Sequence, residues 1–175
     1  LFSEKPAAFK RTLEKSDGAT SFDELNRAMI SDGYALSAAA GCDVAEPVQI
    51  IHLTSQDSQQ KACHIRAQIT VGKGARLQVI ESFIGPAESR YWSHMVSDIQ
   101  LSEGATLDYC QFQQQGRAAL HMTESHSHLA AKAIFNHTSL QLGATLNRTE
   151  LINYLAGKDA QVNLRGAYLG RGKQS

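Results

Sequence analysis

The chain has 175 residues, a formal net charge of +0, 42% hydrophobic residues and 19% charged residues. A chain of this size can bury a hydrophobic core, and this composition argues against disorder. The neutral charge lacks the basic excess of a protein that grips nucleic-acid phosphates, and no apolar run approaches the ~20 residues of a membrane span. We therefore expect a folded domain that binds neither nucleic acid nor membrane.

The first thirty residues predict two helices. Ser3–Lys15 carries two apolar residues four positions apart and stops at Asp17-Gly18. Ser21–Glu24 then matches a capping box, in which the Ser21 hydroxyl would cap a second helix. A predicted apolar stripe follows on this helix, at Phe22, Leu25 and Met29.

Strand-like alternation of apolar and polar residues begins at Asp32-Gly33. It predicts strands at Tyr34–Ala38, Val48–Leu53, Cys63–Val71, Arg76–Phe83, His94–Leu101, Thr106–Phe112, Ala131–Leu142, Thr145–Asn153 and Gln161–Leu169. Turn-like segments rich in glycine and proline separate them, and no segment of helical period intervenes, which disfavours a sheet with helical crossovers. We expect a helical segment at residues 1–32 and an all-β core at residues 33–175.

A short phrase recurs in this core: a small residue, then alanine, a polar residue and an aliphatic residue. It occurs at Gly74–Leu77, Gly104–Leu107, Gly143–Leu146 and Asp159–Val162, so its spacings are 30, 39 and 16 residues. A solenoid explains the phrase, because glycine or aspartate tolerates the positive φ of a corner while alanine packs inside it. Loop insertions would account for the unequal spacing. The alternative is an antiparallel sandwich with glycine-containing turns.

The order of several longer phrases resembles the SufB/SufD family. These phrases are Phe22–Met29, Asp32-Gly33-Tyr34, Glu46–Ile50, Val79–Phe83, and Asn136-His137-Thr138 ahead of Gly143–Leu146. The resemblance runs from about Phe22 to the end of the chain. It implies a partial right-handed parallel β-helix preceded by a short helical segment.

The resemblance also implies a function without catalysis. Members of this family act as scaffold subunits of the SufBCD complex, which supports iron–sulfur cluster assembly in the cytoplasm. The implied partners are a SufB-like sister subunit and a SufC-like ABC ATPase, and open coil ends also predict a homodimer. An iron–sulfur cluster is expected only in the assembled complex. The ATPase docking region of the family would lie beyond Ser175. Because the chain starts at Leu1 and not at methionine, and its repeat pattern runs to Ser175 without a stop, we interpret it as a fragment cut at both ends.

An enzyme is the alternative, because β-helical polysaccharide lyases and hydrolases share this architecture. Such enzymes are typically secreted and carry clusters of charge on one coil face. The neutral chain and its lack of a G-x-S-x-G nucleophile motif argue against them. A hexapeptide-repeat acyltransferase would show a six-residue period, and none is visible. We therefore assign no catalytic residues.

The densest group of metal-ligand side chains lies in His121–His128. On a strand, Glu124, His126 and His128 would share one face, and imidazole with carboxylate suits iron or zinc. A closed site needs three or four converging ligands, however, and the sequence places these three along one edge. A polar strand face with exposed histidines is the more ordinary explanation.

The three cysteines, Cys42, Cys63 and Cys110, are isolated and form no disulfide framework, as expected in a reducing cytosol. Cys110 is a candidate cluster or metal ligand, and Cys63-His64 is a further candidate for a cluster. Iron–sulfur sites usually show clustered cysteines, however, and free cysteine is common in protein cores. We therefore expect buried structural cysteines.

Overall fold

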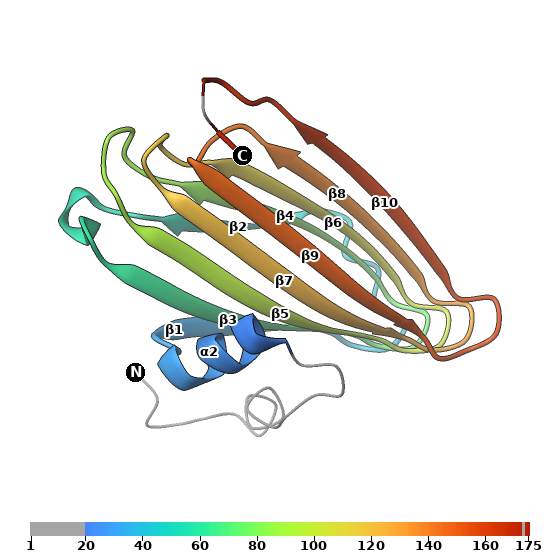
Figure 1. Cartoon of the computed structure of the whole chain (residues 1–175). Helices are drawn as coiled ribbons and strands as arrows, with labels where there is room; N and C mark the ends of the chain where they lie inside the picture. Colours follow the sequence, from blue (N-terminus) through green and yellow to red (C-terminus); the bar gives the residue numbers. More distant parts are fainter. Residues whose placement is uncertain (1–19, 173) are drawn as a thin grey trace.

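The computed structural model describes residues 20–172 and 174–175, and these form a parallel β-solenoid behind one helix. Successive strands alternate between two five-stranded sheets, so each coil adds one strand to each sheet (Figure 1). Every strand pairing is parallel. The expected partial parallel β-helix is therefore confirmed.

The elements have the following bounds. Helix α2 spans Ser21–Met29, and a 3₁₀ turn spans Gln56–Ser58. Sheet A contains β1 (Asp32–Ala38), β3 (Ala62–Val71), β5 (Trp92–Leu101), β7 (Leu120–Leu129) and β9 (Leu146–Leu155). Sheet B contains β2 (Val48–Leu53), β4 (Arg76–Ile84), β6 (Thr106–Gln114), β8 (Ile134–Gln141) and β10 (Gln161–Tyr168).

Strand β7 is the element that the strand predictions omitted. Its inward-facing positions include His121, Thr123, Ser125 and Ser127, all of them polar and buried. Because both faces of β7 are polar, the apolar alternation that reveals the other strands is absent there. The predicted strand Ala131–Leu142 also begins too early, since its first residues form a corner ahead of Ile134.

Helix α2 exists, but of its predicted apolar stripe only Phe22 contacts the sheet. Leu25 and Met29 are 37% and 56% exposed, whereas Asp23 and Asn26 are buried. The cap is also displaced by one residue, because the Thr20 hydroxyl, and not that of Ser21, accepts from the Asp23 amide at 3.1 Å. The helix turns its polar side inward because the sheet surface beneath it is charged. The first predicted helix, Ser3–Lys15, lies outside the described residues.

The corners between sheet A and sheet B follow the repeat, with one correction. Gly74, Gly104 and Asp159 have φ values of 64°, 67° and 61°, as predicted. The equivalent position in the fourth coil is Lys132, with φ 59° and the buried Ala133 after it. Gly143–Leu146 belongs instead to the opposite corner, between β8 and β9. The true spacings are 30, 28 and 27 residues; lysine was missed because positive φ is uncommon outside glycine, asparagine and aspartate.

The solenoid interior is apolar on the side of the corners that lead from sheet A to sheet B. Parallel pairing places like residues on top of each other, such as Leu77 opposite Leu107 and Leu107 opposite Phe135. The buried members of this stack include Ile69, Val71, Leu77, Val79, Ile99, Leu101, Leu107, Leu129 and Phe135. Each coil therefore covers the apolar face of the next, which is how a solenoid acquires a continuous core.

The other side of the interior encloses an ionisable group, the fully buried Glu81 of β4. Its carboxylate accepts from the hydroxyls of Tyr34, at 2.8 Å, and Tyr109. Gln111 Nε2 lies at 3.0 Å and His52 Nε2 at 2.7 Å. Burial alone would raise the pKa of Glu81, but these hydrogen bonds and the His52 imidazole lower it below its usual value. One carboxylate thus connects three successive coils.

We expect Glu81→Gln to destabilise the protein by about 1–3 kcal/mol, because the amide turns a donor toward hydroxyl donors and leaves buried partners unsatisfied. Urea denaturation would measure the change in unfolding free energy. Glu103→Gln is the matched control, because Glu103 is half exposed and forms a surface ion pair with Lys73. Its effect should stay within about 0.5 kcal/mol. Equal effects of the two substitutions would contradict the role assigned to Glu81.

Gly143→Ala should also destabilise the protein, because a Cβ there would lie 1.9 Å from the Gln115 carbonyl oxygen of the preceding coil. Overpacking of this kind costs about 1–3 kcal/mol. At Gly166 a Cβ would have no atom within 4 Å, so Gly166→Ala should leave the unfolding midpoint nearly unchanged. A neutral Gly143→Ala would show that this corner is looser than described.

Candidate functional site

The structure separates the predicted ligand residues into two places. Glu124, His126 and His128 alternate along β7 on the outer face of sheet A, as the strand period predicts. His126 is 2% exposed and contacts Glu124, whereas His128 is half-buried and stacks on Tyr154 with ring centroids 4.6 Å apart. The prediction of exposed histidines is therefore wrong for His126. Cys110 is remote from this group, in β6 of sheet B.

The expectation of buried cysteines is also wrong. Cys42 and Cys63 are exposed, and Cys110 is partly exposed. Alternation along β6 turns Tyr109 and Gln111 into the solenoid interior and therefore directs Cys110 outward.

A buried charge network lies where α2 meets the outer face of sheet A. Asp23 of α2 accepts from Arg66 of β3 at 2.7 Å and from Arg27, one helical turn away, at 2.5 Å. Arg66 is 1% exposed and also donates from Nε and Nη2 to Asp98 of β5, at 3.1 and 2.8 Å. Arg66 thus joins the helix to two adjacent strands.

His126 and Glu124 extend this network onto β7. Nε2 of His126 lies 2.5 Å from Glu124 Oε1, and the Thr20 hydroxyl donates to Glu124 Oε2 at 2.6 Å. Nδ1 of His126 lies 3.9 Å from Asp98. The N-cap of the helix and three strands therefore share one set of charges, which we call the α2 network: Thr20, Asp23, Arg27, Arg66, Asp98, Glu124 and His126.

Charge balance explains the ionisation of the network. Burial alone would lower the pKa of His126, but Glu124 and Asp98 raise it, which favours the imidazolium. Burial alone would raise the pKa of Asp23, but Arg66 and Arg27 lower it. Burial raises the pKa of Asp98, opposed by Arg66. With His126 protonated, three cations face three carboxylates.

A divalent metal is the other species that this geometry suggests. Ligand atoms of Asp23, Glu124 and His126 all lie within 4.8 Å of one another, and these donors suit first-row divalent ions. Both oxygens of Asp23, however, already accept from arginines, and both oxygens of Glu124 are engaged by His126 and Thr20. A metal would have to displace these partners, so the arrangement fits a structural anchor better than an ion site.

Asn26 and Phe22 add uncharged contacts to the anchor. The Asn26 amide donates to the carbonyl oxygens of Ile65 at 3.0 Å and His94 at 3.3 Å. The Phe22 ring meets His94 edge-on, and the Arg148 guanidinium lies 5.1 Å from its centroid. Asp23, Asn26 and Arg66 were not among the predicted site residues. For Asp23 and Asn26 the available signal was the polar stripe of the helix at positions i and i+3, whereas Arg66 lies on β3.

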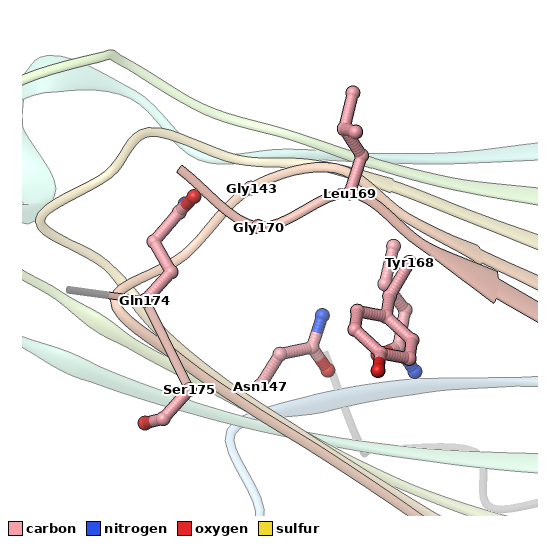
Figure 2. Close-up of a pocket in the computed structure, with 8 residues that line it drawn as sticks. Gly143, Asn147, Tyr168, Leu169, Gly170, Gln174 and Ser175 are labelled. Atoms are coloured by element: carbon pink, nitrogen blue, oxygen red, sulfur yellow. The ribbon is translucent and has the colours of Figure 1, made fainter. Parts of the chain in front are cut away.

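A separate cavity of about 280 Å³ opens at the end of the last coil (Figure 2). Figure 2 shows Tyr168 on one side of the opening and Gln174 with Ser175 on the other. The backbone of Ser175 pairs with Thr145 and Asn147, so the chain returns there from sheet B to sheet A. None of the described side chains that line this cavity carries a carboxylate, imidazole or guanidinium group, and we assign it no chemistry.

Within residues 20–172 and 174–175, no helix has the length and apolar character needed to span a bilayer.

The fold and this site define a class: a parallel β-helical protein with a helix anchored on one sheet by buried charges. The family model described as "SUF system FeS cluster assembly, SufBD core domain" matches residues 52–175. The chain therefore belongs to the SufBD family of iron–sulfur cluster assembly proteins, which confirms the resemblance to SufB and SufD.

One curated relative extends the comparison beyond the core domain. The chain is 23% identical over 146 residues to "Iron-sulfur cluster assembly SufBD family protein slr0076" of Synechocystis sp.. The alignment covers 79% of this chain and 32% of that relative, so the chain spans about a third of the relative's length. No solved structure matches the chain.

We expect the docking of α2 to weaken as pH rises, because the raised pKa of His126 means that its stabilising charge is present below ~6.5 and is lost as pH passes its folded value. Hydrogen exchange of the α2 amides, corrected for intrinsic rates, would measure helix opening. In the profile of helix opening against pH, His126→Gln should abolish the increase at alkaline pH. It should keep the increase at acid pH, where Asp23 becomes protonated.

His128→Gln is the control for this experiment, because His128 lies on the same strand outside the network. It should retain the wild-type profile. An increase at alkaline pH that persists in His126→Gln would contradict the assignment.

Proposed function

We propose that this chain forms the β-helical part of a SufD-type scaffold subunit, which supports iron–sulfur cluster assembly by pairing with a sister β-helix and not by catalysis. The observation that carries the proposal is the SufBD core match over residues 52–175, which includes strands β3 to β10. The relative named as an assembly protein supports it. We favour SufD over SufB from the sequence of Asp32–Leu53.

The outer face of sheet B offers a surface for such pairing. Helix α2 lies against sheet A (Figure 1), and the opposite sheet carries exposed apolar side chains. Ile51 and Leu53 of β2 are 55% and 75% exposed, and register places Ile84 beside Leu53. We call this surface the sheet B stripe: Ile51, Leu53, Ile80, Ile84, Phe112 and Leu140. Several exposed apolar side chains on one sheet face are typical of protein–protein contacts.

Buried carboxylates support the non-catalytic part of the proposal. Asp23, Glu81 and Glu124 each accept hydrogen bonds from protein donors on both oxygens. Groups held in this way contribute to stability and register and have no oxygen directed at a substrate. In this proposal the cluster forms only in the complete complex with the sister subunit and an ABC ATPase, in the cytoplasm.

Affinity purification of the complete protein that carries this chain, tagged at its native locus, tests the proposal. We expect mass spectrometry to identify an ABC-type ATPase and a second β-helical subunit. Ile51→Asp combined with Leu53→Asp should reduce recovery of the second subunit at least about tenfold, since charge in an apolar interface costs more than 1.4 kcal/mol.

Leu120→Asp is the matched control. Leu120 is 40% exposed at the start of β7 in sheet A, so its substitution should leave recovery unchanged. If purification under conditions that keep complexes intact recovers neither partner, the scaffold proposal is overturned. If the variant with both Ile51→Asp and Leu53→Asp still recovers the second subunit in full, the scaffold proposal stands, but the sheet B stripe is not the contact surface.

A further inference from the structure

Two histidines outside the α2 network form a buried pair. His64 of β3 and His94 of β5 are register partners on the outer face of sheet A, 2% and 0% exposed. Their Nδ1 atoms lie 3.1 Å apart, so one ring donates to the other. Burial lowers the pKa of both, that of His94 to about 4 with a contribution from His64, which keeps the pair neutral near neutral pH.

The remaining nitrogen of His94, Nε2, is buried without a hydrogen-bond partner. An orphaned buried N–H is rarer than an under-used acceptor, so the favoured tautomer has Nδ1 of His94 donating to His64. Nε2 then carries a bare lone pair. A hydrogen bond on one ring nitrogen that fixes the other as a ligand is the usual arrangement behind a metal-binding histidine.

A methionine lies beside His94 on the neighbouring strand. Met122 of β7 is the register partner of His94, and both line a cavity of about 10 Å³ beneath Phe22. A cavity of ~10–15 Å³ admits one small species. The Trp92 ring stacks on the His94 ring, with centroids 5.3 Å apart and planes within 3° of parallel.

The charged groups at the cavity are already paired. Glu124 is held by His126 and Thr20, and the Arg148 guanidinium lies 2.6 Å from Glu150. The imidazole nitrogen and the thioether are therefore the donors that remain for a ligand. Thioether sulfur and imidazole favour soft cations, whereas hard cations require oxygen ligands.

We propose that Nε2 of His94 and the thioether sulfur of Met122 form a binding site for a soft monovalent cation, with Cu⁺ as the biological example. His64 is a positioning residue that holds the His94 tautomer. The Phe22 ring lines the cavity and covers it on the side of α2. The proposal does not depend on the scaffold function.

Trp92 provides the readout, because its ring stacks on that of His94. It is the only tryptophan among these 175 residues, and subtracting the signal of a Trp92→Phe variant removes the fluorescence of any other tryptophan in the complete protein. The complete protein would be titrated with Cu⁺ under anaerobic, reducing conditions against a chromophoric Cu⁺ chelator. Every cysteine of the complete protein, including Cys42, Cys63 and Cys110, would be replaced by serine, because thiolates bind Cu⁺ themselves. We expect one cysteine-independent equivalent whose binding quenches Trp92 fluorescence.

Variants then identify the ligands. His94→Gln and Met122→Leu should each weaken this equivalent at least about tenfold, and His64→Phe should weaken it about tenfold through loss of the positioning hydrogen bond. Met122→Leu nearly conserves volume, so an unchanged melting temperature would exclude misfolding as the cause. His128→Gln and Met29→Leu are matched controls outside the cavity and should retain full affinity.

Three results would overturn the proposal. The first is the absence of a cysteine-independent equivalent, which would indicate that the cavity holds only water. The second is binding that leaves Trp92 fluorescence unchanged. The third is a folded Met122→Leu variant with undiminished affinity.

Discussion

A charged carboxylate enclosed in the solenoid, that of Glu81, is the constraint that orders the rest of the structure. An ionised group in a protein interior costs several kcal/mol unless hydrogen bonds and opposite charge offset that cost. Tyr34, His52, Tyr109 and Gln111 meet this demand from the coils on either side. A one-residue slip of β4 would turn Glu81 outward and its apolar neighbours with it. Burial of apolar side chains alone would permit several strand registers between coils, and the Glu81 carboxylate selects one of them.

The same electrostatic demand explains the helix on the outside of sheet A. Arg66 can be buried there because it forms an ion pair with Asp23 of α2, and the same pair stabilises the buried Asp23 carboxylate. The helix consequently shows its polar side to the protein and leaves Leu25 and Met29 exposed. The two outer faces of the solenoid differ as a result. Helix α2 packs on sheet A through buried charges, whereas no described helix packs on sheet B, which carries the apolar stripe that we propose as a contact surface.

The α2 network and the His94–Met122 cavity are physically connected. Phe22 of α2 closes the cavity, and the network holds α2 in place. A cation bound only when the helix is docked would stabilise the docked state by mass action. Loss of the helix anchor would in turn open the cavity to water. Binding of a soft cation and docking of α2 are therefore thermodynamically linked, so each stabilises the other by the same free energy.

The sequence by itself determined the local features of this protein: strand alternation, glycine corners, and the shared face of Glu124 and His126. These follow from a two-residue side-chain period and from backbone sterics, which act over a few residues. Only the tertiary structure decided that His64 meets His94, that Asp23 meets Arg66, and that Lys132 forms a corner. Such pairs depend on coil length, and register offsets run from 33 residues between β1 and β3 to 26 between β7 and β9. Because loops set those offsets, no fixed spacing in the sequence reveals which side chains stack across neighbouring coils.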